Sequence, residues 1–123
     1  LCLIDCDKFK SINDTYGHAV GDKVIIAIAE TLQKLCHDKN VAFRLGGDEF
    51  AIFMPGIVEQ KAAEKLFEIL FENIRRIDIE EMQGKSIEIS MGTCFYEGTE
   101  EVSFDQLYKN ADSVMYQSKE KRL

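Results

Sequence analysis

The sequence predicts an α+β protein with a ferredoxin-like (palm-like) fold. Segments with strand and helix periodicity follow one another in the order β-α-β-β-α-β-α, and a Gly-Gly pair at 46–47 joins two strands into a hairpin. Each long predicted helix also has one apolar face. A β-α-β-β-α-β core with a central antiparallel hairpin, and with helices packed on one face of the sheet, is the ferredoxin-like arrangement.

The length and composition predict a single soluble domain at residues 1–123. A chain of 123 residues can bury one core without disulfides or a structural metal, and 46% hydrophobic with 30% charged residues is ordinary for a globular protein. No apolar run approaches the ~20 residues that span a membrane, so we expect no membrane contact by this domain. The net charge of −7 predicts no nucleic-acid partner, because such a surface needs a basic stripe. A nucleotide remains compatible with this charge, since bound metal ions supply positive charge.

The spacing of the four cysteines predicts reduced thiols in a cytosolic protein. There is no CxxC pair and no zinc-ligand spacing among Cys2, Cys6, Cys36 and Cys94. On one strand, Cys2 and Cys6 would lie about 13 Å apart at ~3.3 Å per residue. A disulfide needs Cα atoms within roughly 7 Å, so this pair cannot close within the strand.

The first half of the chain predicts three strands and one long helix. Residues 1–5 form a continuous apolar run, which is typical of a strand buried on both faces. Residues 6–22 are polar and rich in turn formers, which indicates a loop with a short helical piece. A helix is predicted at 22–37, and two strands are predicted at 41–45 and 49–54. The apolar face of the helix consists of Ile25, Ile28, Ala29, Leu32 and Leu35.

The second half predicts a helix, a strand and a final helix. The helix at 59–77 has an inward face made of Ala63, Leu66, Phe67, Leu70, Ile74 and Ile77. Alternation over 85–95 predicts a strand with one buried face. The last helix, at 103–121, begins with Ser103 and Gln106 in a capping-box pattern. Its apolar stripe consists of Phe104, Leu107, Tyr108, Ala111, Val114 and Met115.

Four carboxylates are the candidates for a divalent-cation site. Asp5 and Asp7 end the first strand, while Asp48 and Glu49 follow the hairpin glycines. In the predicted sheet the first strand lies beside the hairpin, so we expect Asp5 to face Asp48. Magnesium prefers carboxylate and carbonyl oxygens and usually bridges substrate phosphates, and a pair of such ions supports in-line displacement at phosphorus. The alternative is a set of solvated turn carboxylates.

Backbone amides and lysines are the candidates for phosphate binding. The residues after the first strand supply amides at the start of a helical piece, with Lys8 and Lys10 beside them. The alternative is a solvated loop with two surface lysines. Lys119, late in the last helix, is a further phosphate candidate, or else part of a solvated helix end.

Asn13 and Asp22 are the candidates for recognising a base. A carboxylate accepts two hydrogen bonds from the N1–H and 2-amino groups of guanine, and adenine offers no such pair of donors on that edge. A site built from buried polar groups discriminates strongly against the wrong base. The alternative for Asp22 is a helix N-cap before the apolar run that follows it.

Three motifs together resemble the GGDEF domain family, the diguanylate cyclases. "GGDEF" stands at 46–50, "DCDKFKSINDTYGHAVGD" at 5–22 is similar to the family's DxDxFKxxND…GHxxGD stretch, and "ADSVMYQSK" at 111–119 is similar to its late-helix signature. The resemblance covers nearly the whole chain, with the motifs in the family's order.

The resemblance implies roles for the metal-binding and catalytic candidates. Asp5 and Asp48 would hold Mg²⁺, or Mn²⁺ as the alternative, together with the backbone carbonyl of Cys6. Glu49 would serve a second ion or the general base, so Asp48 and Glu49 are the catalytic candidates.

The resemblance also implies roles for the substrate-binding candidates. Gly46 and Gly47 would let the nucleotide approach the backbone closely. Asn13 and Asp22 would read guanine. The terminal phosphates would be held by the backbone amides of Lys8, Phe9 and Lys10 and by the side chain of Lys119.

The implied reaction joins two GTP molecules into cyclic di-GMP with loss of two pyrophosphates. Each domain would hold one GTP, so a homodimer is required for attack of each 3′-hydroxyl on the partner's α-phosphate. We expect an upstream sensory or regulatory domain in the full-length protein, and a cytoplasmic location, either free or as the cytoplasmic part of a membrane-bound protein. Two alternatives are a catalytically silent GTP-binding module that regulates a neighbouring domain and a purely protein-binding role.

Three departures from the family pattern lead to further expectations. The usual RxxD product-inhibition site reads His37-Asp38-Lys39-Asn40, so we expect no feedback inhibition through it. The usual phosphate-binding arginine falls on Leu123, with Arg122 one position early. The family's LTGLxNR-like stretch before the first strand is absent, which predicts that the chain is a fragment of a longer protein.

Overall fold

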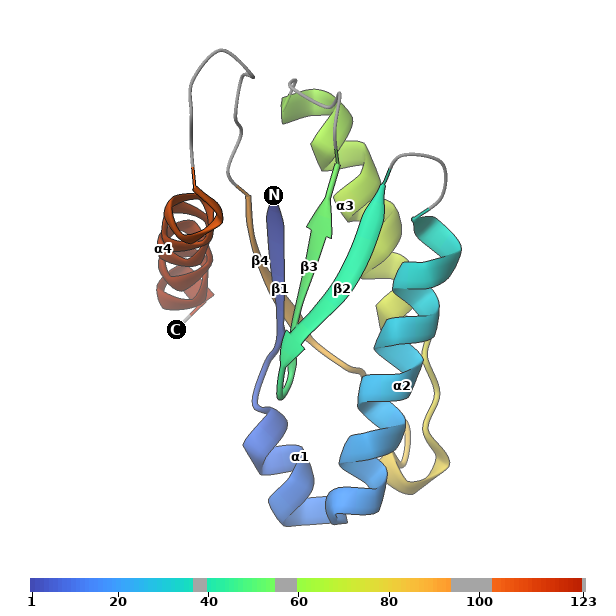
Figure 1. The fold of residues 1–123 in the computed structure, drawn as a ribbon. Helices are drawn as coiled ribbons and strands as arrows, with labels where there is room; N and C mark the ends of the chain where they lie inside the picture. The colour runs from blue at the N-terminus through green and yellow to red at the C-terminus, as the bar shows by residue number, and fades with distance from the viewer. Residues whose placement is uncertain (37–39, 55–59, 94–102, 123) are drawn as a thin grey trace.

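A four-stranded antiparallel sheet forms the centre of the computed structural model (Figure 1). The structure describes residues 1–36, 40–54, 60–93 and 103–122. Within these ranges, the side chains at 60, 62–63, 104 and 117–122 are not described. The strand order is β2-β3-β1-β4. The strands are β1 (Cys2–Cys6), β2 (Val41–Gly46), β3 (Glu49–Phe53) and β4 (Ile89–Thr93). β1 pairs with both β3 and β4, so the predicted ferredoxin-like α+β fold is confirmed.

The helices connect and cover these strands. They are α1 (Phe9–Tyr16), α2 (His18–Leu35), α3 (Gln60–Arg75) and α4 (Phe104–Arg122), with a short 3₁₀ turn η1 (Glu80–Met82) before β4. None of these helices, in the part of the chain that the structure describes, is long and apolar enough to cross a membrane.

The main core lies between the sheet and helices α2 and α3. Alternate residues of β1 and β3 point into it, as period-2 geometry requires. Ile28 and Leu32 of α2 and Leu70 and Ile74 of α3 are almost completely buried there, as predicted for the apolar faces of both helices, while the side chain of Ala63 lies outside the described ones. The buried strand residues of this core are Cys2, Ile4, Cys6, Phe50, Ile52 and Ile89.

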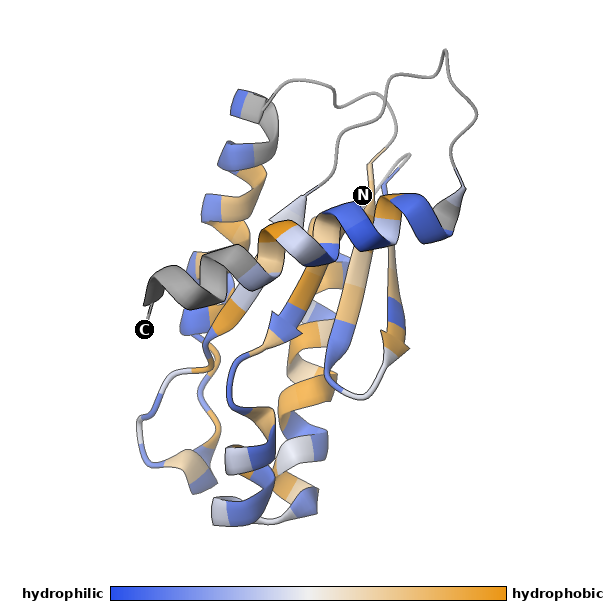
Figure 2. Ribbon diagram, turned by 90° about the vertical axis from the view of Figure 1, so that its left-hand side faces the viewer, coloured by the Kyte–Doolittle hydropathy of each residue, from blue (hydrophilic) through white to orange (hydrophobic). Residues whose placement is uncertain are grey.

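The two long helices of the ferredoxin-like core, α2 and α3, lie on one face of the sheet, as expected, whereas α4, which follows that core, packs on the opposite face (Figures 1 and 2). A second, smaller core of Leu3, Ala51, Ala111 and Met115 lies under α4. The predicted burial of β1 on both faces is therefore confirmed. A Cβ placed on Gly92 of β4 would overlap the carbonyl of Ala111, so only glycine lets the helix approach this closely.

Burial of both faces also corrects the prediction for residues 85–95. Ser90 and Gly92 occupy the positions expected to face solvent, yet both are buried under α4. The strand runs over 89–93, and residues 94–95 lie outside the described part of the chain.

The segment 6–22, expected to be mainly loop, is mostly helical. Gly17, with φ of 93°, separates α1 from α2 and occupies the N-cap position of α2. Because α2 begins at His18, Asp22 lies inside the helix, and the alternative of Asp22 as its N-cap is wrong. By contrast, the backbone N–H of Gln106 donates to the Ser103 hydroxyl at 3.2 Å, as expected at the start of α4.

No disulfide joins the cysteines of the described residues, in line with the expectation that Cys2 and Cys6 cannot pair within β1. Cys2 and Cys6 are buried and Cys36 is half-buried, and all are free cysteines. Cys94 lies outside the described residues.

Candidate functional site

The candidate residues from three segments meet at one end of the sheet. β1 ends at Cys6 beside the β2–β3 turn, and the chain continues directly into α1 (Figure 1). The backbone N–H of Cys6 donates to the carbonyl of Asp48 at 3.3 Å, which ties the end of β1 to the turn. Backbone pairing therefore brings the start of the 5–22 motif next to the GGDEF motif, although about 40 residues of chain separate them.

The hairpin turn has an open backbone on its glycine side. Gly46 and Gly47 have φ of 151° and 53°, and a Cβ at either would meet no atom within 4 Å. The guanidinium of Arg44 donates to the carbonyl of Gly47 from Nε at 3.0 Å and from a terminal nitrogen at 2.6 Å. The turn is thus braced from its own strand, while its glycines leave room for a ligand next to the backbone.

Asp5 is directly opposite Glu49 in the pairing of β1 with β3. The expectation that Asp5 faces Asp48 is therefore wrong by one residue, because Asp48 belongs to the turn and β3 begins at Glu49. Partners in an antiparallel pair point to the same face, with Cβ atoms about 4.5–5.5 Å apart. Like charges in this position destabilise a sheet, so the pair is suited to share a cation.

Tyr108 of α4 lies over this carboxylate pair. Its hydroxyl donates to Oε1 of Glu49 at 2.7 Å. This hydrogen bond, partial burial and the nearby charges of Glu49, Asp112 and Asp5 raise the pKa of Tyr108 from 10.0 to about 12. From the sequence, Tyr108 is predicted only as part of the apolar stripe of the last helix. Because the hydroxyl of a buried tyrosine usually forms a hydrogen bond, its polar end could have indicated this contact.

Asp7 is held by the neighbouring strand. Its backbone N–H donates to the carbonyl of Glu88 at 2.8 Å, and its Oδ1 accepts a 2.5 Å hydrogen bond from the hydroxyl of Ser90. Ser90 is the one buried polar residue among those the structure describes, and no motif or spacing pattern predicts its contact with Asp7. The carboxylate of Asp7 is thus directed toward β4.

The β1–α1 turn presents amides at the start of α1. Lys8 is the N-cap residue, with φ of 55°, a left-handed conformation that costs a non-glycine residue roughly 1–2 kcal/mol. No side chain among the described residues caps this helix end. The N–H groups of Phe9 and Lys10 belong to the first turn, where backbone donors have no partner within the helix and can bind an anion.

The two candidates for base recognition lie on either side of the α1–α2 junction. A Cβ on Gly21, which directly precedes Asp22, would overlap the carboxamide of Asn13. Asn13 is half-buried and Asp22 is exposed. The junction therefore places the Asn13 amide against the residue that precedes Asp22, on the neighbouring helix.

Several predicted residues fall outside what the structure describes. Lys119 and Arg122 belong to α4, but their side chains are not described, and Leu123 lies outside the described residues altogether. The same holds for positions 37–39 of the segment that replaces the RxxD site. Their expected roles stay predictions.

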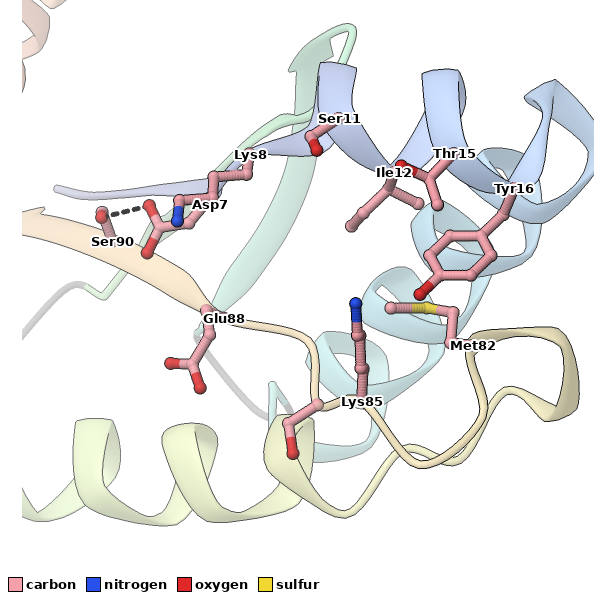
Figure 3. A pocket seen from close by; sticks show the side chains of 11 residues that line it. Asp7, Lys8, Ser11, Ile12, Thr15, Tyr16, Met82, Lys85, Glu88 and Ser90 are labelled. Atoms are coloured by element: carbon pink, nitrogen blue, oxygen red, sulfur yellow. Dashed lines mark hydrogen bonds between the residues drawn. The ribbon is translucent and has the colours of Figure 1, made fainter.

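A cavity of about 740 Å³ lies beside this end of the sheet, between α1 and the segment around 82–90 (Figure 3). Figure 3 shows the side chain of Lys85 extending toward α1 and the hydrogen bond between Asp7 and Ser90 at the cavity's edge. The cavity shares Asp7 and Lys8 with the candidate site. It is lined by neither the hairpin turn nor Asn13, so it is a separate feature.

The residues present suit a metal ion that is shared with a bound phosphate. Within the described ranges, no group of three or more His, Cys, Asp or Glu side chains could hold an ion alone. Magnesium commonly uses one or two carboxylates and completes its shell with water and substrate phosphates. Opposed carboxylates at Asp5 and Glu49, next to Asp48 and a backbone carbonyl at Cys6, match this donor set.

Paired carboxylates, an open glycine turn and a helix N-terminus at one end of a sheet define a site suited to a nucleoside triphosphate with a divalent ion. Comparison with known proteins agrees with this class: the family model described as "Diguanylate cyclase, GGDEF domain" matches residues 1–122. The chain belongs to the GGDEF domain family.

Curated relatives include diguanylate cyclases from two bacteria. Diguanylate cyclase DgcM of Escherichia coli is 36% identical over 119 residues, which cover 97% of this chain and 28% of that protein. Diguanylate cyclase VdcA of Vibrio cholerae is 36% identical over 121 residues, which cover 97% of this chain and 35% of that protein. The chain thus spans about a third or less of the length of these relatives.

Solved structures share the fold. The GGDEF domain of DgcB from Caulobacter crescentus, in complex with c-di-GMP, superposes with a TM-score of 0.83 at 27% identity, covering 98% of this chain and 71% of that chain. Diguanylate cyclase SiaD from Pseudomonas aeruginosa, in complex with its activator SiaC, gives a TM-score of 0.84 at 27% identity, covering 98% and 45%.

Proposed function

We propose that this domain is the catalytic domain of a diguanylate cyclase, which condenses two GTP molecules into cyclic di-GMP and two pyrophosphates. The observation that carries the proposal is the placement of Asp5 opposite Glu49 beside the open Gly46–Gly47 turn. This arrangement is unfavourable for a sheet alone and favourable for a metal-bound triphosphate. Membership of the GGDEF family supports the same assignment.

The substrate would lie across the end of the sheet. Asn13 and Asp22 would hold the guanine, and the amides of Phe9 and Lys10 at the start of α1 would hold the terminal phosphates, with Lys8 and Lys119 nearby. Asp5, Asp48 and the carbonyl of Cys6 would hold Mg²⁺ or Mn²⁺, which supplies charge neutralisation at the α-phosphate.

Each domain would supply half of the reaction. A 3′-hydroxyl attacks the α-phosphate of the GTP on the partner domain; a P–O bond forms and the bond to pyrophosphate breaks. Glu49 would accept the hydroxyl proton or hold a second ion. Two such attacks close the ring, so the proposal requires a homodimer, and in a longer protein an upstream domain would control how the two copies meet. The use of GTP places the proposed reaction in the cytoplasm.

The test is incubation of concentrated protein with GTP and Mg²⁺, with chromatographic separation of the products. We expect cyclic di-GMP from the wild type, at a rate per domain that rises with protein concentration, and none from Asp48→Asn. Asp78→Asn changes an exposed carboxylate between α3 and η1 and should leave the yield unchanged. GTP binding without product would instead support the silent GTP-binding module.

A second measurement addresses product inhibition. Because His37 and Asn40 stand at the ends of the family's RxxD positions, added cyclic di-GMP should not slow the reaction through that site. Inhibition by added cyclic di-GMP that is lost when His37 and Asn40 are both replaced by alanine would show that this expectation is wrong.

A further inference from the structure

The hydrogen bond between Tyr108 and Glu49 joins α4 to the proposed catalytic hairpin. It spans 59 residues of sequence and is 2.7 Å long. The tyrosine ring packs against the small core that contains Leu3 and Met115, so the ring is anchored while its hydroxyl reaches the carboxylate. Glu49 belongs to the GGDEF motif itself, whereas Tyr108 lies outside all three motifs.

The bond acts on a side chain that otherwise has considerable freedom. Holding a glutamate in one orientation costs up to about 1.5–2 kcal/mol of side-chain entropy. A hydroxyl donor on Oε1 fixes the plane of the carboxylate before any ligand arrives. The negative charges of Glu49, Asp112 and Asp5 all act on the Tyr108 hydroxyl, and the acceptor of its hydrogen bond is Glu49.

We propose that Tyr108 is a positioning residue, whose hydroxyl holds the Glu49 carboxylate on the α4 face of the sheet beside Asp5, oriented toward a divalent ion bound there. The inference rests on the proposed function. Removal of a residue that orients a metal-binding carboxylate typically lowers metal affinity or activity 10- to 100-fold. In this chain α4 thus contributes to the site through Tyr108 in addition to the expected contribution of Lys119.

Tyr108→Phe tests the proposal, because it keeps the ring and removes one oxygen. The probe is Mn²⁺, titrated into protein with a non-hydrolysable GTP analogue and followed by the electron paramagnetic resonance of free Mn²⁺. We expect Mn²⁺ to bind about 10-fold more weakly to the variant, and kcat to fall while KM for GTP changes little. The matched control is Tyr116→Phe on the same helix, where the side chain is 63% exposed, and its Mn²⁺ affinity should equal that of the wild type.

A double-mutant cycle with Glu49→Gln separates positioning from a general loss of stability. If Tyr108 acts through Glu49, removing its hydroxyl should have little further effect on Mn²⁺ affinity in the Glu49→Gln background. An unchanged or tighter Mn²⁺ affinity of Tyr108→Phe, or an equal loss in both backgrounds, would overturn the proposal. Absence of cyclic di-GMP from wild-type protein would count against the proposed function alone, since the Mn²⁺ titration needs no turnover.

Discussion

Replacement of Gly21 by alanine should weaken GTP binding without deleting any group that contacts GTP. Gly21 is buried at the end of the first turn of α2, and a Cβ there would lie 3.0 Å from Cγ of Asn13, with the carboxamide oxygen closer still. Non-bonded heavy atoms prefer separations of about 3.5–4.0 Å, so the Asn13 amide must move aside. Phe9, at 3.3 Å from the same Cβ, limits the directions in which it can move.

The size of the effect follows from the loss of one hydrogen bond to the base. Such a bond contributes about 0.5–1.5 kcal/mol, which corresponds to an increase of about 2- to 10-fold in Kd for GTP. The free energy of unfolding should stay the same or increase. Alanine is favoured over glycine in a helix by about 0.8–1.0 kcal/mol, and the displaced atoms belong to a flexible side chain. Calorimetric titration with a non-hydrolysable GTP analogue and urea unfolding measure the two quantities separately.

The decisive comparison is the same substitution in an Asn13→Ala background. If Gly21→Ala acts by displacing the Asn13 amide, its effect on GTP affinity should disappear once that amide is gone. A Kd that stays at the wild-type value in the single variant would show that Asn13 does not contact the base. An undiminished effect in the double variant would refute the steric reasoning.

Four further predictions concern stability. Gly92→Ala forces α4 away from β4, because the new Cβ meets helix backbone, and should lower the free energy of unfolding by about 1–3 kcal/mol in urea titrations. Leu70→Ala removes a fully buried side chain and should cost about 2–5 kcal/mol in the same assay; a smaller loss would indicate a core that collapses around the gap. Burial raises the pKa of the Cys2 thiol from 9.0 to about 12, so the unfolded chain loses this proton at a lower pH than the folded chain. The free energy of unfolding should therefore fall as pH rises from about 9 to 12, and it should fall less in Cys2→Ala. Asp5→Asn relieves the opposition to Glu49 and should raise the thermal midpoint in metal-free buffer, by an amount equivalent to roughly 0.2–1 kcal/mol, while product formation is lost.

The strand order and the location of the site could be predicted because both depend on local chemistry. Continuous apolar character marked β1 as a central strand, and the Gly46–Gly47 pair marked the hairpin that lies next to it. Once those neighbours are fixed, Asp5 and the GGDEF carboxylates must meet at one end of the sheet. The one-residue error in their pairing arose because a two-residue turn, Gly47–Asp48, leaves Asp48 outside the ladder.

The face occupied by α4 could not be predicted from its own sequence. Its stripe with Ala111 and Met115 shows that the helix buries one side, but a stripe does not say which face of the sheet covers it. The face that α4 covers depends on β4. Ser90 and Gly92 occupy the positions of β4 that the alternation of apolar residues assigns to solvent. Small residues on a strand are compatible both with exposure to solvent and with close packing against a helix. Hydropathy alone does not distinguish these two environments.

Features that are unfavourable for the fold are concentrated at the end of the sheet where the GGDEF motif lies. Lys8 adopts a left-handed conformation, Asp5 and Glu49 oppose each other, and the hairpin glycines leave their backbone uncovered. Elsewhere among the described residues, Gln83 after η1 is the other non-glycine residue with positive φ, and no buried side-chain nitrogen or oxygen lacks a partner. Local rules are typically broken where function requires it. A metal-bound polyanion would offset these costs, because it neutralises the opposed carboxylates and covers the open backbone of the turn, and the domain should therefore be most stable when both nucleotide and divalent ion are bound.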